Sequence, residues 1–349
     1  MLKAAFQYSY INAKIRSMKS NLLRPSDYEN LTIVSGYDGL AECLRITQYG
    51  KRAGQFPSSF DGLIRMYYKD LFDDYEKIIK AAPGRGKGLI LHLYQKYELE
   101  NLKAVLRTVG SGKRGQNMEK LLLPIGEPQS FSAEDLLRLK SPDEILSRLK
   151  GSWYYEPLKN SIYRFEEEKE TFPMEMALDQ WYYRRLWKII LSLGCREKKT
   201  ARGLFGVFID ILNIIWIFRF KQMGHFSAEE ILNYSLMYGG HLSPVLLKRL
   251  AYSSDQKDVL RNLTGTSYQK LLACLNDLEA ISVPLWRYFL SLAEKNWCGF
   301  PFQIGTILDY ILFKEMEVRD LVTLTEAKRL HLPQMMMSKY LIRYGWTNS

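Results

Sequence analysis

Apolar residues recur along the chain at the spacing of an α-helix. Near the N-terminus an apolar residue returns every three or four positions, which makes one stripe along a helix. The members of this stripe are Ala4, Tyr8, Ile11, Ile15, Met18 and Leu22. Further stretches with helical character are 60–80, 179–193 and 285–295, and strand-like alternation is hard to find in the sequence. The pattern therefore predicts an all-α protein.

One eleven-residue pattern of acid, amide, apolar and basic positions occurs in three places. It reads YELENLKAVLR at 97–107 and IDILNIIWIFR at 209–219. A weaker copy at 316–326 has Asp320 in place of the amide and Glu326 in place of the arginine. The copies are offset by 112 and 107 residues, which exceeds the period of about 20 to 50 residues of a solenoid repeat. The offset is the size of a small domain.

Each copy places an acid and an amide-position residue three apart, on one face of a predicted helix. These positions are Glu98 and Asn101, Asp210 and Asn213, and Glu317 and Asp320. The middle helix is so apolar that it should be buried on nearly all sides. An unpaired buried polar group costs about 1 to 3 kcal/mol, so the pair is expected to bond within the protein and fix the packing register. The alternative, an active-site acid and amide, would not need three copies.

Two further signals recur in the same order ahead of the acid–amide helices. A serine with the sequence context of a helix cap occurs at Ser26, Ser132 and Ser227. The first of these opens a capping-box sequence, after Pro25 ends the N-terminal helix. A leucine followed five positions later by a tyrosine then ends at Tyr49, Tyr154 and Tyr268. This order predicts three homologous helical lobes, spanning 1–125, 126–225 and 226–349.

Length and composition indicate a soluble globular protein. A chain of 349 residues can bury a large core in two or three domains. The most apolar run, 204–220, contains Asp210 and is shorter than a typical membrane span, and the N-terminus has no signal-peptide pattern. The four cysteines and four histidines show neither disulfide nor metal-ligand spacing. These features predict a cytoplasmic protein with reduced thiols.

Positive charge is concentrated in the first third of the chain. The net charge is +11, of which residues 1–125 carry +8, residues 126–225 carry +2 and residues 226–349 carry +1. Such an excess is compatible with nucleic acid, an anionic membrane surface or an acidic protein partner. Lys87, Lys113 and Arg114, in two glycine-rich turns, are the candidate partner contacts.

No catalytic, cofactor-binding or metal-binding residue is predicted. The turn 83–88 resembles a phosphate loop, but Gly88 occupies the hydroxyl position and the preceding stretch is helical. The acidic run 166–170 is typical of a solvated helix face. Nucleic-acid binding is not expected, because the basic residues form neither a recognition motif nor a concentrated stripe.

Three stretches resemble the V-type ATPase central-stalk subunit that is called C in bacteria and archaea and d in eukaryotes. They are YSYINAKIRSMKSNLL at 8–23, ELENLKAVLR at 98–107 and KEMEVRDL at 314–321. The resemblance covers essentially the whole chain in the right order. It implies a funnel of three similar helical lobes about a pseudo-threefold axis. It also implies a non-catalytic rotor subunit, peripheral on the cytoplasmic face of the membrane, between the shaft and the proteolipid ring.

The last lobe departs from the family pattern. Asp320 stands where asparagine is usual, 323–326 lacks the expected apolar segment with a basic end, and 332–337 is rich in leucine and methionine.

Two alternative functions remain open from sequence: a stand-alone helical adaptor derived from the same family, and a basic RNA-binding protein.

Overall fold

The computed structural model describes residues 2–112, 118–272, 277–299 and 302–344, and over these ranges it contains helices and no β-strand. The predicted all-α class is confirmed. The predicted helix at the N-terminus corresponds to α1 (Leu2–Lys19), and those at 60–80, 179–193 and 285–295 correspond to α5 (Phe60–Ala81), α11 (Phe172–Ser192) and α17 (Ser282–Trp297). The stripe residues of α1 whose side chains are described are all buried.

The chain forms two compact units. Unit 1 comprises residues 1–86 and 190–349, and unit 2 comprises residues 87–189. The lobe boundaries expected from the sequence repeat remain a prediction. Unit 2 contains α6 (Gly86–Gly110, whose first residue belongs to unit 1), η1 (Met118–Leu121), α7 (Ala133–Leu137), α8 (Pro142–Arg148), α9 (Tyr155–Lys159), α10 (Ile162–Glu168) and most of α11.

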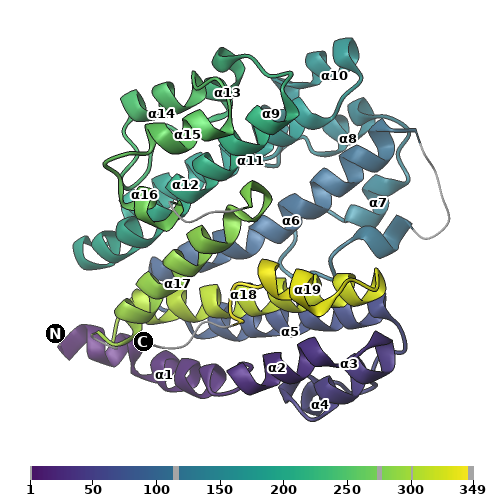
Figure 1. Ribbon diagram of the computed structural model, residues 1–349, viewed down its shortest axis with the longest axis vertical. Coiled ribbons are helices and arrows are strands. Elements are labelled where there is room, and N and C mark those ends of the chain that lie inside the picture. Colours follow the sequence, from purple (N-terminus) through teal and green to yellow (C-terminus); the bar gives the residue numbers. More distant parts are fainter. Residues whose placement is uncertain (1, 113–117, 273–276, 300–301, 345–349) are drawn as a thin grey trace. The chain divides into compact units, whose positions relative to one another are not determined.

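Unit 1 is built around α18 (Ile304–Arg329), which packs against α1, α5 and α17 (Figure 1). Apolar and polar residues alike are buried on every side of this helix, which is the arrangement of a core helix. The other helices of unit 1 within residues 1–86 are α2 (Pro25–Ile33), α3 (Gly36–Arg45) and α4 (Gln48–Arg52). The other helices of unit 1 within residues 190–349 are α12 (Cys195–Met223), α13 (Ala228–Tyr234), α14 (Pro244–Ala251), α15 (Gln256–Asn262), α16 (Ser267–Leu272), η2 (Leu278–Ala280) and α19 (Gln334–Tyr340).

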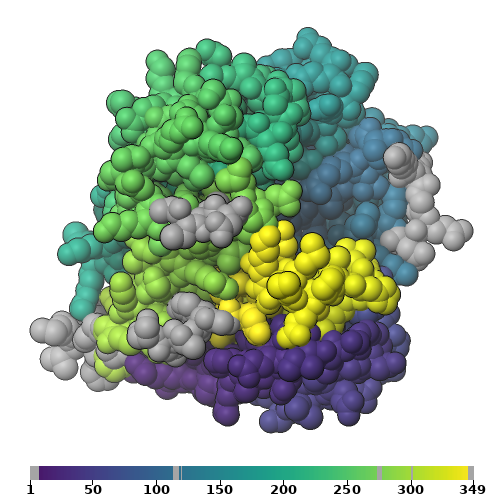
Figure 2. All heavy atoms as spheres, viewed as in Figure 1, coloured from purple at the N-terminus to yellow at the C-terminus, as the bar shows by residue number. Residues whose placement is uncertain are grey.

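The two ends of the chain meet within unit 1. Figure 2 shows the C-terminal segment lying against the N-terminal helices, and α19 contacts α2. Lys328, near the end of α18, donates hydrogen bonds to the carbonyls of Thr32 and Val34 at the end of α2. The N-terminal helices are therefore packed together with the last third of the chain.

One helix, α12, is long and apolar enough by length and composition to cross a membrane. The sequence led us to expect that the apolar run 204–220 is too short for a membrane span. That expectation is corrected, because the run is only part of a 29-residue helix. Within the structure, however, 78% of its most apolar window is buried. Burial of that extent is the pattern of a core helix, so length and composition alone are weak evidence for a span.

Two of the three expected serine caps are present. Ser132 accepts a hydrogen bond from the Asp135 N–H, and Ser227 forms a capping box with Glu230. The expected cap at Ser26 is wrong, because α2 begins one residue earlier, at Pro25. Proline suits the first helical position, since its fixed φ is already helical and its missing N–H needs no partner there.

Candidate functional site

In unit 2, Glu98 and Asn101 on α6 hold the loop that follows the helix. Asn101 exchanges two hydrogen bonds with the backbone of Leu123, accepting at 2.7 Å and donating at 3.0 Å. Glu98 accepts from the backbone N–H and hydroxyl of Ser130 and, at 2.8 Å, from the hydroxyl of Tyr154. Burial raises the pKa of Glu98, and the bonds from Ser130 and Tyr154 offset part of that effect. This set is the first network.

In unit 1, Asp210 and Asn213 on α12 form a second network of the same kind. Asn213 accepts from Leu236 N–H at 2.8 Å and donates to its carbonyl at 2.9 Å. Asp210 accepts from the hydroxyl of Tyr268 at 2.9 Å and from consecutive backbone N–H groups, the shortest being that of His241 at 2.6 Å. Gly239 lies against this carboxylate, and a Cβ there would collide with it. Burial raises the pKa of Asp210.

The third network, also in unit 1, is centred on Glu317 of α18. Its carboxylate accepts from the hydroxyl of Tyr49 at 2.9 Å and from the backbone N–H of Leu23 at 2.6 Å. Two cations bond the same carboxylate, Lys314 at 3.0 Å and Arg343 at 2.7 Å. Glu317 is fully buried. Burial alone would raise the pKa of this carboxyl, but Lys314 and Arg343 hold it below its usual value.

The three networks have a common construction along the chain. The residue at the amide position bonds a backbone group 22, 23 and 22 residues further on. Each acid bonds a buried tyrosine hydroxyl, and in the first two networks the tyrosine follows the acid by 56 and 58 residues. In the third network the tyrosine is Tyr49, which comes before the acid in the sequence. The N-terminal segment therefore supplies a tyrosine that, in the other two networks, comes from the chain after the acid–amide helix. Sequence order groups each tyrosine with the next acid–amide helix. Hydrogen bonding instead groups Tyr154 and Tyr268 with the preceding helix and Tyr49 with the last one.

The third network also extends into an ion-pair chain, from buried Lys314 to Arg52 at the surface, that sequence analysis did not find. Lys314 bonds Asp70 of α5 at 2.7 Å, and Asp70 in turn bonds Arg52 at 2.7 Å. The ammonium of Lys314 also lies over the ring of Tyr49, 4.4 Å from its centroid. The sequence signal that could have found this partner is a lysine about one turn before the acid on the same predicted helix. Arg343, beyond the last helix, had no such signal.

The geometry around Asp320 accounts for the departure from asparagine at this position. Asn101 and Asn213 each face one N–H and one carbonyl, which suits an amide. Asp320 instead faces two N–H donors, those of Ile342 at 2.8 Å and Arg343 at 2.7 Å. The two donors bond different oxygens of the side chain, so both positions must be acceptors, as they are in a carboxylate but not in an amide. Burial raises the pKa of Asp320 to about 6.

Asp320→Asn is therefore expected to destabilise the protein, although it restores the amide found in the other two networks. The new NH2 group would face a backbone N–H and leave it unpaired, at a cost of about 1 to 3 kcal/mol. The urea midpoint at pH 7.5 measures the change, with exposed Asp38→Asn as the matched control. An unchanged midpoint for Asp320→Asn would show that the two-donor geometry does not select the carboxylate.

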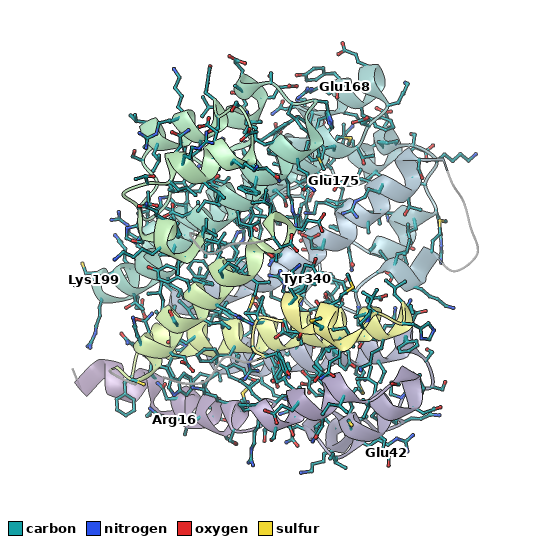
Figure 3. The ribbon with its side chains drawn as sticks, viewed as in Figure 1. Arg16, Glu42, Glu168, Glu175, Lys199 and Tyr340 are labelled. Atoms are coloured by element: carbon teal, nitrogen blue, oxygen red, sulfur yellow. The ribbon has the colours of Figure 1, made fainter. Side chains whose placement is uncertain are left out.

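Of the three candidate partner contacts, one lies within the described residues. Lys87 is exposed on the first turn of α6, whereas Lys113 and Arg114 fall outside the described residues. The turn around 83–88 connects helix α5 to helix α6, so no strand precedes it as a phosphate loop requires. The acidic side chains at the end of α10, including Glu168, are exposed (Figure 3). Among the residues described, no group of His, Cys, Asp or Glu is arranged to hold a metal ion.

Comparison with known proteins identifies relatives along nearly the whole chain. A model of the ATP synthase (C/AC39) subunit family matches residues 11–340. The C subunit of the A-type ATP synthase of Methanocaldococcus jannaschii is 28% identical, covering 92% of this chain and 82% of that protein. The corresponding protein of Pyrococcus horikoshii, with the same name, is 29% identical, with 90% and 84% covered. That of Archaeoglobus fulgidus is 25% identical, with 96% of each chain covered.

Proposed function

The chain belongs to the ATP synthase (C/AC39) subunit family, and from this membership we propose that it is a non-catalytic rotor subunit of a V/A-type rotary ATPase. In this role it couples the rotating shaft to the proteolipid ring during proton or sodium transport. The family match over residues 11–340 is the observation that carries the proposal. The relatives are named as C subunits of A-type ATP synthases, which supports partners within a rotary complex.

The three networks support a three-lobed arrangement about a pseudo-threefold axis. Each joins an acid–amide helix to the loop and tyrosine of the following segment, with nearly the same spacing along the chain. The third is completed by Leu23 and Tyr49, so the repeat closes on itself. A shell transmits torque when its helices do not slide past one another. Buried polar bonds resist such sliding because a displaced helix strands donors and acceptors at a cost of about 1 to 3 kcal/mol each.

The chemistry of the networks favours a mechanical role over catalysis. Glu98, Asp210 and Glu317 are buried and each carboxylate accepts several hydrogen bonds from the protein itself. A general acid or base needs access to a substrate proton, within hydrogen-bond reach. In the described part of the chain these carboxylates accept hydrogen bonds from backbone N–H groups and tyrosine hydroxyls. The subunit is accordingly proposed to bind no nucleotide and no metal.

Attachment to the membrane is proposed to occur through the ring, on its cytoplasmic face. The +8 charge of residues 1–125 fits a contact with acidic partner loops, shaft residues or anionic lipid beside the ring. Charge at such a contact sets orientation and association rate more than standing affinity. Lys87, Lys113 and Arg114 are the residues proposed to make it.

Recovery of the tagged protein from solubilised membranes tests this function. We expect shaft subunits and proteolipid ring to co-purify with it, and the Lys87→Glu, Lys113→Glu, Arg114→Glu variant to associate more slowly with isolated rotor at low salt. A control with the same charge change is Arg148→Glu, Lys150→Glu, Lys159→Glu, at exposed positions, and it should associate at the wild-type rate. Recovery with unrelated proteins alone would contradict the rotor role and favour a stand-alone adaptor.

A further inference from the structure

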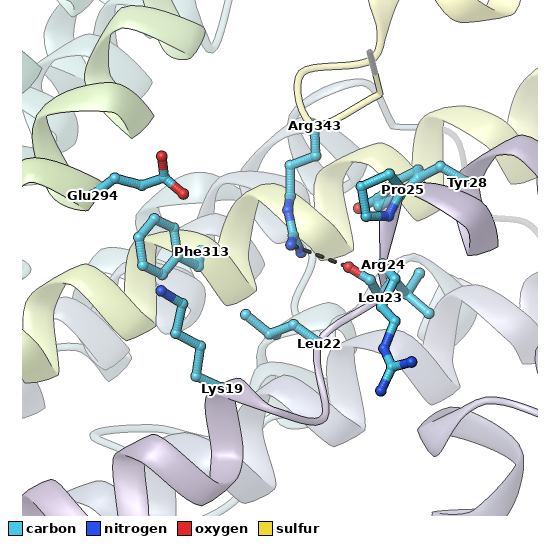
Figure 4. A pocket seen from close by; sticks show the side chains of 9 residues that line it. All are labelled: Lys19, Leu22, Leu23, Arg24, Pro25, Tyr28, Glu294, Phe313 and Arg343. Atoms are coloured by element: carbon cyan, nitrogen blue, oxygen red, sulfur yellow. Dashed lines mark hydrogen bonds between the residues drawn. The ribbon is translucent and has the colours of Figure 1, made fainter. Parts of the chain in front are cut away.

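A cavity of about 230 Å³ lies in unit 1 between the corner that joins α1 to α2, the helices α17 and α18, and the C-terminal segment (Figure 4). It is lined by Lys19, Leu22, Leu23, Arg24, Pro25, Tyr28, Glu294, Phe313 and Arg343. Its volume has room for several waters or for one small oxoanion. The third network reaches the cavity through Arg343 and Leu23, but the other lining side chains have no part in it.

Two hydrogen-bond donors in this wall have no acceptor among the residues that the structure describes. The hydroxyl of Tyr28 has no hydrogen-bond partner although the residue is only 1% exposed. An unpaired buried hydroxyl is costly, so an acceptor is expected beside it. The ammonium of Lys19 lies 4.0 Å from the ring centroid of Trp297 and 4.7 Å from that of Phe313. No carboxylate of the described residues forms an ion pair with it within 4.0 Å.

Arg343 adds a second cation to the cavity. Its guanidinium donates to Glu317 at 2.7 Å and to the carbonyl of Leu23 at 3.2 Å. A guanidinium carries five N–H groups, so donors remain after these two bonds. Arg24 lines the edge of the cavity, but its charged end turns away from Arg343 (Figure 4). The donors that line the cavity are therefore those of Lys19, on the side of Phe313, and those of Arg343 and Tyr28 (Figure 4).

One acceptor, Glu294 of α17, also lines the cavity, on the side of Phe313 and Lys19 (Figure 4). Burial raises the pKa of Glu294, with Lys19 and Arg343 acting in the opposite direction. A carboxylate next to a fully deprotonated anion would repel it. An anion that keeps one O–H group can instead donate to Glu294 while its other oxygens accept from the cations and the tyrosine.

We propose that this cavity binds hydrogen phosphate, or the phosphate group of a monoester in its protonated form, between Lys19, Tyr28, Arg343 and Glu294. Phosphate has enough acceptor oxygens for the donors and one proton for the carboxylate. The bound anion would join the α1–α2 corner to α17 and to the C-terminal segment. Phosphate is therefore expected to stabilise unit 1, which holds the third network, and this effect is independent of the rotor function.

Calorimetric titration of the full chain with sodium phosphate at pH 7 and constant ionic strength tests the proposal. We expect one saturable site and a melting temperature that rises with phosphate until the site is full. Sulfate has the same size but carries no proton at this pH, so it cannot donate to Glu294 and is repelled by its carboxylate. Sulfate should therefore bind about tenfold more weakly, a difference that corresponds to that lost hydrogen bond and that repulsion. Titration with a phosphate monoester then shows whether the site admits a substituent.

Three variants assign the binding to this cavity. Lys19→Met should abolish it, Tyr28→Phe should weaken it by about tenfold, and Glu294→Gln should remove the preference for phosphate over sulfate. Exposed Lys51→Met is the control and should bind as the wild type does. The circular dichroism spectrum of each variant confirms folding. Absence of saturable heat in the wild type, or equal affinity in folded Lys19→Met, would overturn the proposal.

Discussion

Replacing Glu317 by glutamine is expected to lower the free energy of unfolding by about 3 to 5 kcal/mol at pH 7, because it removes the buried charge that Lys314 and Arg343 share and leaves Arg343 uncompensated. Both carboxylate oxygens are fully used: one accepts from Tyr49 and Lys314, and the other from Leu23 and Arg343. The amide of glutamine would turn an NH2 group toward one of these donor pairs. Lys314 keeps its bond to Asp70, but Arg343 has only this ion pair among those of the described residues.

The pH dependence of this difference follows from the direction of the pKa shift. The pKa of Glu317 is lower in the folded protein than in the unfolded chain, where it is about 4.3. Its contribution to stability is then fully present above pH 4.3 and is lost as the pH falls through the folded-state pKa. Urea midpoints of wild type and Glu317→Gln should therefore differ at pH 7 and converge in acid.

Glu326→Gln is the matched control for this change, since Glu326 lies on the same helix and its side chain is 42% exposed. A surface ion pair contributes about 0 to 1 kcal/mol, so its midpoint should stay close to that of the wild type at every pH. If Glu317→Gln behaved like this control at pH 7, the third network would not hold unit 1 together.

The helices could be predicted because their information is local. The stripe of α1 and the apolar run within α12 are visible in consecutive residues, and both correspond to helices in the structure. The cap of α2 was expected at Ser26 but lies at Arg24, two residues earlier, because a capping-box sequence at Ser26 competes with a proline that favours the first helical position. Local patterns thus locate helices well and their ends less well.

The partners of the acid–amide pairs could not be predicted, because they are mostly backbone groups in loops. Any residue offers an N–H and a carbonyl, so the sequence around Leu123 or Leu236 carries no mark of the contact. The third network adds a topological difficulty, since Glu317 bonds Tyr49 from the opposite end of the chain. The equal spacing of 22 or 23 residues between amide and loop is recognisable only once the loops are placed.

Asn213→Leu should reduce the free energy of unfolding by about 2 to 5 kcal/mol, even though leucine matches the apolar surroundings in the middle of α12. Asn213 is fully buried and satisfies both backbone groups of Leu236, which is itself only 2% exposed. Leucine would strand this N–H and this carbonyl, each at about 1 to 3 kcal/mol, and water has no access to replace the amide. The gain from burying an additional apolar side chain is smaller, since leucine has nearly the shape of asparagine.

Urea midpoints at pH 7 decide the matter, with exposed Asn30→Leu on α2 as the matched control. The control should change the midpoint little, because surface substitutions are usually within about 0.5 kcal/mol. Asn101→Leu in unit 2 should behave as Asn213→Leu does, since its amide bonds Leu123 in the same two ways. If both variants are destabilised and their unfolding transitions are distinct, the same bonding of an amide to loop backbone stabilises each unit. A midpoint for Asn213→Leu equal to that of Asn30→Leu would mean that the loop pairs its backbone elsewhere, and Asn213 would then not hold this loop to α12.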